Sequence, residues 1–163
     1  MTVAMGLLRR FNFAMALAAG LALAACASNP NQGTVGAAGA AAPGSQQDFV
    51  VNVGDRVFFE SDSSELTAQS RATLDKQTQW LQTYNRYAFT IEGHADERGT
   101  REYNIALGAR RAQAVRDYLA SRGIDANRMR TISYGKERPV AVCDDISCWS
   151  QNRRAVTVLN QSS

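Results

Sequence analysis

The stretch from about Arg101 to Ser121 limits the possible folds of this 163-residue chain more than any other. Its apolar residues recur at spacings of 4, 3, 3 and 4, which is the pattern of an α-helix with one buried face. They are Ile105, Ala109, Ala112, Val115 and Leu119. Gly123 follows, at a position where glycine commonly ends a helix. The sequence therefore predicts one long helix whose apolar face packs on another layer of structure.

Four short segments have the residue pattern of β-strands. They are residues 56–62, 87–93, 129–135 and 153–160. In the first segment Val57 and Phe59 share one face, opposite to Phe58. A second helix is expected over residues 68–84, because Thr67 can cap it and apolar residues recur within it at helical spacing. This order of elements predicts an α+β fold, an α/β sandwich with two main helices packed on one face of a mixed four-stranded sheet.

The first 25 residues have the pattern of a secretory signal. Arg9 and Arg10 precede an apolar run of about fifteen residues, which is short for a transmembrane helix of roughly 20. The run ends in LAAC, from Leu23 to Cys26, which resembles the site where bacterial lipoproteins are cleaved and the cysteine is acylated. The alternative is an ordinary cleavage site with an incidental cysteine. Ala27 follows the cysteine instead of Asp, a pattern that indicates transfer to the outer membrane.

Removing the signal also removes two arginines, so the formal charge falls from +3 to 16 − 15 = +1. Nucleic-acid binding thereby loses its main support. Beyond Cys26, residues 27–47 are small, polar and uncharged, a composition that cannot form a core. We therefore expect a lipidated cysteine and flexible linker over residues 26–47 and a folded domain over residues 48–163.

Two further cysteines, Cys143 and Cys148, are separated by four residues. In the oxidising compartment that a secretory signal implies, a disulfide closing a short surface loop is expected. A metal site would need four soft ligands at suitable spacing, and only these two are present.

The stretch IEGHADERGTREYNIALGARRA, residues 91–112, contains the single histidine of the chain and a concentration of charge. Glu92, His94 and Asp96 would share one strand face and could approach a metal, but Gly93 and the polar residues after Asp96 indicate that the strand ends there. Catalysis would need an activated nucleophile, and none lies near His94 in sequence. Asp62 and Asp96 could form a carboxylate pair as in glycosidases, but no other feature supports that chemistry.

Recognition of a charged ligand is the third interpretation of this stretch. Asp96 is expected at a strand end and Arg111 about two turns into the helix, on a face shared with Asn104 and Leu107. A carboxylate and a guanidinium that face one pocket can bind a zwitterion, the first taking its ammonium group and the second its carboxylate. The alternative is an ordinary salt bridge within the domain.

Three stretches of the sequence are informative when taken together: GHADERGTREYNIALGARRA, FESDSSEL, and SYGKERPVA with NRRAV. They resemble the OmpA-like peptidoglycan-binding domains over about residues 55–160. The resemblance implies the fold of that family and a binding domain without catalysis, metal or cofactor. Its ligand would be the meso-diaminopimelate of the peptidoglycan stem peptide. The resemblance assigns the zwitterion to Asp96 and Arg111, gives His94 the role of a hydrogen-bonding loop residue, and places further contacts at Ser61, Asp62, Asn104 and Leu107.

The resemblance also implies a biological setting. We expect a lipid-anchored outer-membrane protein, with its domain in the periplasm, that holds the membrane to the wall without a covalent bond. Lipoprotein members of the family work with TolB and the Tol complex in envelope integrity and cell division. The alternative is a structural outer-membrane lipoprotein that acts mainly through protein–protein contacts.

Overall fold

The computed structural model describes residues 41–160, which contain one mixed sheet of four strands in the order β1-β4-β2-β3. The strands are β1 (Arg56–Phe58), β2 (Phe89–His94), β3 (Met129–Gly135) and β4 (Arg154–Leu159). β4 pairs antiparallel with both β1 and β2, whereas β2 and β3 are parallel. The predicted mixed four-stranded sheet is thereby confirmed.

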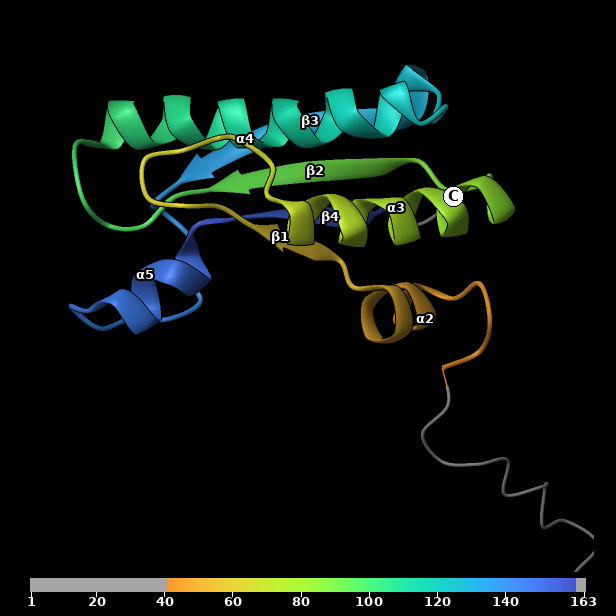
Figure 1. Ribbon diagram of the computed structural model, residues 1–163, viewed down its shortest axis with the longest axis horizontal. Helices are drawn as coiled ribbons and strands as arrows, with labels where there is room; N and C mark the ends of the chain where they lie inside the picture. Colours follow the sequence, from red (N-terminus) through yellow and green to blue (C-terminus); the bar gives the residue numbers. More distant parts are fainter. Residues whose placement is uncertain (1–40, 161–163) are drawn as a thin grey trace, which may run out of the picture. The chain divides into compact units, whose positions relative to one another are not determined.

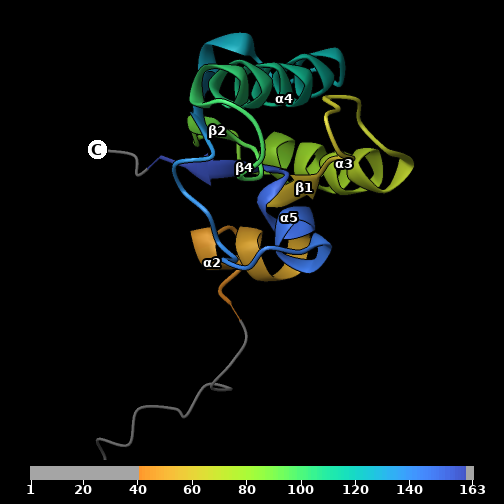
Figure 2. The same cartoon turned by 90° about the vertical axis from the view of Figure 1, so that its left-hand side faces the viewer.

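Two long helices, α3 (Ala68–Thr83) and α4 (Arg101–Ser121), lie on the same side of the sheet (Figures 1 and 2). Thr67 caps α3 by accepting a hydrogen bond from the backbone N–H of Ser70, as its position in the sequence predicts. Thr100 caps α4 in the same way, and Gly123 ends it with a φ of +91°, a conformation that favours glycine. The predicted sandwich of two helices on one sheet face is confirmed.

The core fills the space between this helical layer and the sheet. Val57 and Phe59 point into it while Phe58 is exposed, which is the alternation predicted for the first strand. The central strand β2 contributes Phe89 and Ile91, both with 0% exposure. The helices supply Leu74, Leu81, Ala112, Val115 and Leu119.

The predicted buried face of α4 is wrong in its first half. Ala109 is exposed and Ile105 only half-buried, whereas Leu107 and Gly108 are buried. The cause is a close approach between Gly108 and Gly93 of β2, where a Cβ on either glycine would collide with the backbone of the other. This contact with β2 determines which residues of α4 are buried. The spacing of apolar residues within the helix does not reveal such a contact.

The fold begins earlier than predicted. A short helix, α2 (Gln46–Asp48), leads into the π-helical turn η1 (Phe49–Val53). The carbonyl of Gly44 accepts hydrogen bonds from Arg86 Nη2 and the Tyr87 hydroxyl, at 2.7 and 2.8 Å. The last residues assigned to the linker are therefore bound to the domain, because side chains far away in sequence hold their backbone. The signal, Cys26 and residues 27–40 of the linker lie outside the described residues.

A further helix, α5 (Ile146–Asn152), was not predicted. It has only seven residues, and its Cys148 is bonded to Cys143 in the turn that precedes the helix. A 3-10 turn, η2 (Ala126–Arg128), precedes β3. Over residues 41–160, no helix combines the length and apolar character required to cross a membrane.

Candidate functional site

The loop after β1, the carboxyl end of β2 and the first turns of α4 meet at one end of the sheet (Figure 1). They surround a hollow of about 260 Å³. Five of the six residues predicted to bind a ligand line it, and Arg111 does not. The lining residues are Ser61, Asp62, Asp96, Arg98, Gly99, Tyr103, Asn104 and Leu107.

Asp96 lies just beyond β2 and is almost fully buried, with 7% exposure. Arg98 donates to both of its carboxylate oxygens, from Nη2 to Oδ2 at 2.6 Å and from Nε to Oδ1 at 3.1 Å. Arg153 Nη1 approaches Oδ2 at 3.5 Å. Burial disfavours ionisation of Asp96, but the hydrogen bonds and positive charge of Arg98, with help from Arg153, outweigh it and lower the pKa of this carboxyl. Asp96 is therefore an anion whose acceptor positions are filled by two arginines.

Arg111 has 0% exposure and lies beneath the loop after β1. Its guanidinium donates to three backbone carbonyls, those of Ser63 at 2.8 Å, His94 at 2.8 Å and Glu60 at 3.1 Å. Burial lowers the pKa of Arg111 to about 10, against the opposing charge of Asp96, so it stays protonated at neutral pH. Asp96 and Arg111 form no salt bridge with each other, because Asp96 pairs with Arg98 and Arg153 instead.

Asn104 and Leu107 reach the hollow from successive turns of α4. Asn104 is 2% exposed, and its Nδ2 donates to the carbonyl of Arg98 at 2.7 Å. This bond fixes the loop that carries Asp96, at a point where Gly99 has a φ of +85° that favours glycine. Asn104 thus shapes the wall of the hollow, while Leu107 supplies an apolar patch.

Ser61 and Asp62 lie on the opposite wall. Ser61 Oγ accepts a hydrogen bond from Arg98 Nη2 at 2.9 Å, so Arg98 spans the hollow between Ser61 and Asp96. Asp62 adopts a positive φ of 55° and accepts a hydrogen bond from the hydroxyl of Tyr103. Tyr103 was not predicted as a site residue, although it lies four residues before Leu107 and so shares its helix face.

A second feature missed by the sequence is the contact between this site and α5. The guanidinium of Arg98 stacks on the ring of Trp149, 4.3 Å from its centroid. Trp149 Nε1 donates to Glu97 Oε1 at 2.8 Å. Trp149 directly follows the disulfide-bonded Cys148, so the short closed segment supports the rim of the hollow.

His94 lies in the core instead of in the hollow. Its ring is 2% exposed and stacks on Tyr134 at 5.6 Å, and within the described residues neither ring nitrogen has a hydrogen-bond partner. The expectation of a hydrogen-bonding loop side chain is therefore wrong: the carboxylate oxygen Glu92 Oε2 lies 3.6 Å from Nε2, and the carbonyl of His94 accepts from Arg111. Burial, then the charges of Arg154 and Arg138, lowers the pKa of His94 to about 4, so the ring is neutral at pH 7. Over residues 41–160, no group of three side chains could hold a metal ion.

The model of the OmpA family matches residues 58–154 of the chain. A peptidoglycan-associated lipoprotein of Rhizobium meliloti is 70% identical over 150 residues, which cover 89% of this chain and 85% of that protein. One from Haemophilus influenzae is 42% identical over 142 residues, covering 83% of this chain and 88% of the relative.

Among solved structures, the peptidoglycan-associated lipoprotein from Burkholderia pseudomallei is 42% identical with a TM-score of 0.63, covering 65% of this chain and 90% of its own. The C-terminal domain of Helicobacter pylori MotB, 22% identical with a TM-score of 0.62, covers 67% of this chain and 86% of its own and shares the fold.

Proposed function

Since the chain belongs to the OmpA family, among relatives that are peptidoglycan-associated lipoproteins, we propose that its domain binds peptidoglycan without altering it. The ligand group would be the zwitterionic end of meso-diaminopimelate in the stem peptide, bound in the hollow beside Asp96. The observation that carries this proposal is the ionised, buried carboxylate of Asp96, which faces the hollow and is paired with a side chain that can move. The side chain of Arg98 is 44% exposed, so it can leave without disrupting the core.

Binding would then proceed as an exchange of cations. The ligand's ammonium group replaces the guanidinium of Arg98 on Asp96, so the buried carboxylate is never left unpaired. Arg153 stays in place, because it is buried and anchored by its Nε to the carbonyl of Phe59 at 3.0 Å. The exchange therefore keeps one fixed and one replaceable partner on Asp96.

The ligand's carboxylate would be attracted by the positive charge of Arg111 beneath the loop. Direct contact requires the carbonyls of Glu60 and Ser63 to release its guanidinium, because each of its nitrogens already donates to a carbonyl. Tyr103 and Asn104 complete the wall on the helix side. Arg111 is thus proposed both as the frame of the loop and as the source of positive charge.

The predicted lipoprotein signal over residues 1–25 indicates where in the cell this binding would take place. We infer that Cys26 carries the lipid and that the protein is held at the outer membrane with its domain in the periplasm. Two or more acyl chains give stable anchoring where one gives only marginal binding. Linkage of membrane and wall, and cooperation with TolB and the Tol complex in cell division, are part of the same proposal.

The test is a calorimetric titration of the domain with the tripeptide L-Ala-γ-D-Glu-meso-diaminopimelate. The same peptide with lysine in place of diaminopimelate lacks one carboxylate and should bind at least tenfold more weakly. Asp96→Asn should lose about 2–5 kcal/mol of binding free energy, since it removes the partner of the ammonium group. Asp117→Asn, an exposed acid on α4, is the matched control and should bind normally.

Equal affinity for the two peptides would refute diaminopimelate recognition. A folded Asp96→Asn variant, checked by circular dichroism, that binds like the control would refute the assignment of the site. Incubation of the protein with purified cell wall should release no soluble muropeptides over time, and a steady release would show an enzyme instead.

A further inference from the structure

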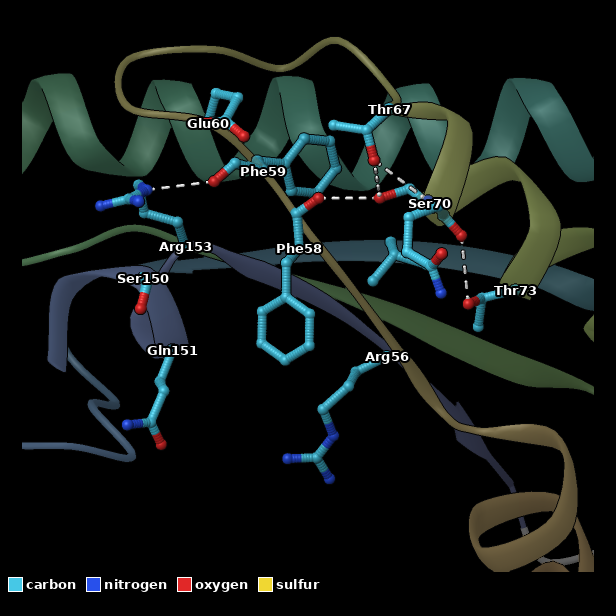
Figure 3. Close-up of a pocket in the computed structure, with 12 residues that line it drawn as sticks. Arg56, Phe58, Phe59, Glu60, Thr67, Ser70, Thr73, Ser150, Gln151 and Arg153 are labelled. Carbon is cyan, nitrogen blue, oxygen red and sulfur yellow. Dashed lines mark hydrogen bonds between the residues drawn. The ribbon is translucent and has the colours of Figure 1, made fainter. Parts of the chain in front are cut away.

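A second hollow, of about 460 Å³, lies between β1, the first turns of α3 and α5 (Figure 3). β1 is an edge strand, so this hollow follows the free edge of the sheet. On one side it is closed by a hydrogen bond from Ser70 Oγ to the carbonyl of Phe58, at 2.8 Å. On the other side Ser150 and Gln151 of α5 form the wall. None of the ligand contacts proposed above explains this groove.

Phe58 is the distinctive residue of the groove. Its ring is 47% exposed, and Figure 3 shows it between the side chains of Arg56 and Gln151. A hollow lined by an aromatic ring and a few polar side chains has the composition of a ligand-binding site. The face of an aromatic ring is negative and attracts the C–H groups that one face of a sugar ring presents. The flanking amide and guanidinium can hydrogen-bond hydroxyl and acetamido groups.

The groove adjoins the hollow that contains Asp96 along the chain after β1. Phe59 and Glu60 line the groove, and the next two residues line the hollow. Arg153 lines the groove and also approaches Asp96 at 3.5 Å. Four residue steps separate Phe58 from Asp62, a span of at most about 14 Å. In peptidoglycan two amino acids and a lactyl ether separate diaminopimelate from the amino sugar, and the two residues alone span about 7 Å.

We propose that this groove binds the amino sugar of the glycan strand to which the bound stem peptide is attached. The proposal rests on the proposed function, because it places the stem peptide in the hollow beside Asp96. The sugar ring packs on Phe58, while Gln151 and Arg56 bond its polar substituents. The domain then recognises the junction of peptide and glycan, and a free peptide occupies only part of the site.

The test compares two ligands by calorimetry: the free tripeptide and the same tripeptide attached to the disaccharide N-acetylglucosaminyl-N-acetylmuramic acid. The unmodified domain should bind the disaccharide form about three- to tenfold more tightly, the gain expected from one aromatic packing contact. Phe58→Ala should abolish this gain, and Phe58→Tyr should retain it. Ile132→Ala, a matched exposed apolar residue on the opposite edge strand, should also retain it.

The side-chain amide signal of Gln151 supplies a second readout by NMR. It should shift with the disaccharide form and stay unchanged with the free tripeptide. If the tripeptide binds but the disaccharide adds no affinity, the glycan site is refuted while the proposed function stands. If neither ligand binds the unmodified domain, both proposals fail. Equal losses in Phe58→Ala and Ile132→Ala would also overturn the glycan site.

Discussion

The guanidinium of Arg98 lies 4.3 Å from the centre of the Trp149 ring while its Nη2 bonds to Asp96. This stack connects the disulfide-closed segment to the carboxylate at which the ligand is proposed to bind. The position of Arg98 in the free protein is therefore held by contacts on two sides. Each side can be tested separately.

Trp149 should report ligand binding through its fluorescence, because displacement of Arg98 from Asp96 changes the stack on its indole ring. The chain has one other tryptophan, Trp80, which is buried among core aromatic rings. Titration with the diaminopimelate tripeptide should change the emission of the unmodified domain and leave that of Trp149→Phe constant. Binding seen by calorimetry without any change in the emission of the unmodified domain would contradict the exchange of cations.

Arg98→Ala should bind the tripeptide more tightly, since it removes the cation that the ligand has to displace. Because the side chain of Arg98 is 44% exposed, its pair with Asp96 contributes at most about 1 kcal/mol, and the gain should be about two- to fivefold in Kd. Arg122→Ala, a half-exposed arginine at the far end of α4, is the control. Weaker binding by Arg98→Ala would show instead that Arg98 contacts the ligand.

Arg111→Ala should lower stability as well as binding. The change leaves three carbonyls without their donor, at a cost of about 3 kcal/mol or more in the free energy of unfolding. Urea denaturation measures this loss, and Arg110→Ala, an exposed neighbour on α4, should lose almost nothing. Unfolding midpoints that agree for the two variants would mean that Arg111 does not hold the loop.

His94 should make the fold sensitive to acid. Its pKa is lowered to about 4, so the folded protein keeps the ring neutral where an unfolded chain, with a pKa near 6.5, takes up a proton. The stability from this residue is complete above pH 6.5 and is lost as pH falls toward 4, by at most about 3 kcal/mol. His94→Asn should flatten the dependence of unfolding free energy on pH across that interval. Parallel curves for the two proteins would show that the histidine does not titrate differently on folding.

Local features of the fold could be predicted because their causes lie close together in the chain. The bounds of α4 follow from its apolar spacing and from Gly123, and the start of α3 from Thr67. The face that α4 buries could not be predicted, because it depends on the meeting of Gly93 and Gly108. The ordered backbone at Gly44 has the composition of a linker and is held by side chains more than forty residues away.

The candidate site could also be predicted from the sequence only in part. Residues at the end of β2 and along one face of α4 could be brought together from spacing alone, as Asp96, Asn104 and Leu107 show. The arginine that pairs with Asp96 could not be predicted from spacing. Arg98 is positioned by its stack on Trp149, and Trp149 lies on a short helix that has no apolar stripe to reveal it in the sequence. The charge types predicted a pocket that binds a zwitterion, but only the structure shows which arginine beside Asp96 is exposed and which is buried.

The hydrogen bonds to Gly44 also determine how the domain would respond to mechanical force. Gly44 is tied to Tyr87, two residues before β2, and Asp96 lies two residues after the same strand. A pull between the entering chain and a ligand on Asp96 would therefore act along β2, whose ladders to β3 and β4 would be sheared. Bonds sheared together share the tension, whereas bonds that are unzipped break one after another. Under the proposed function, the domain would thus resist traction between its anchored N-terminal end and a ligand bound at Asp96.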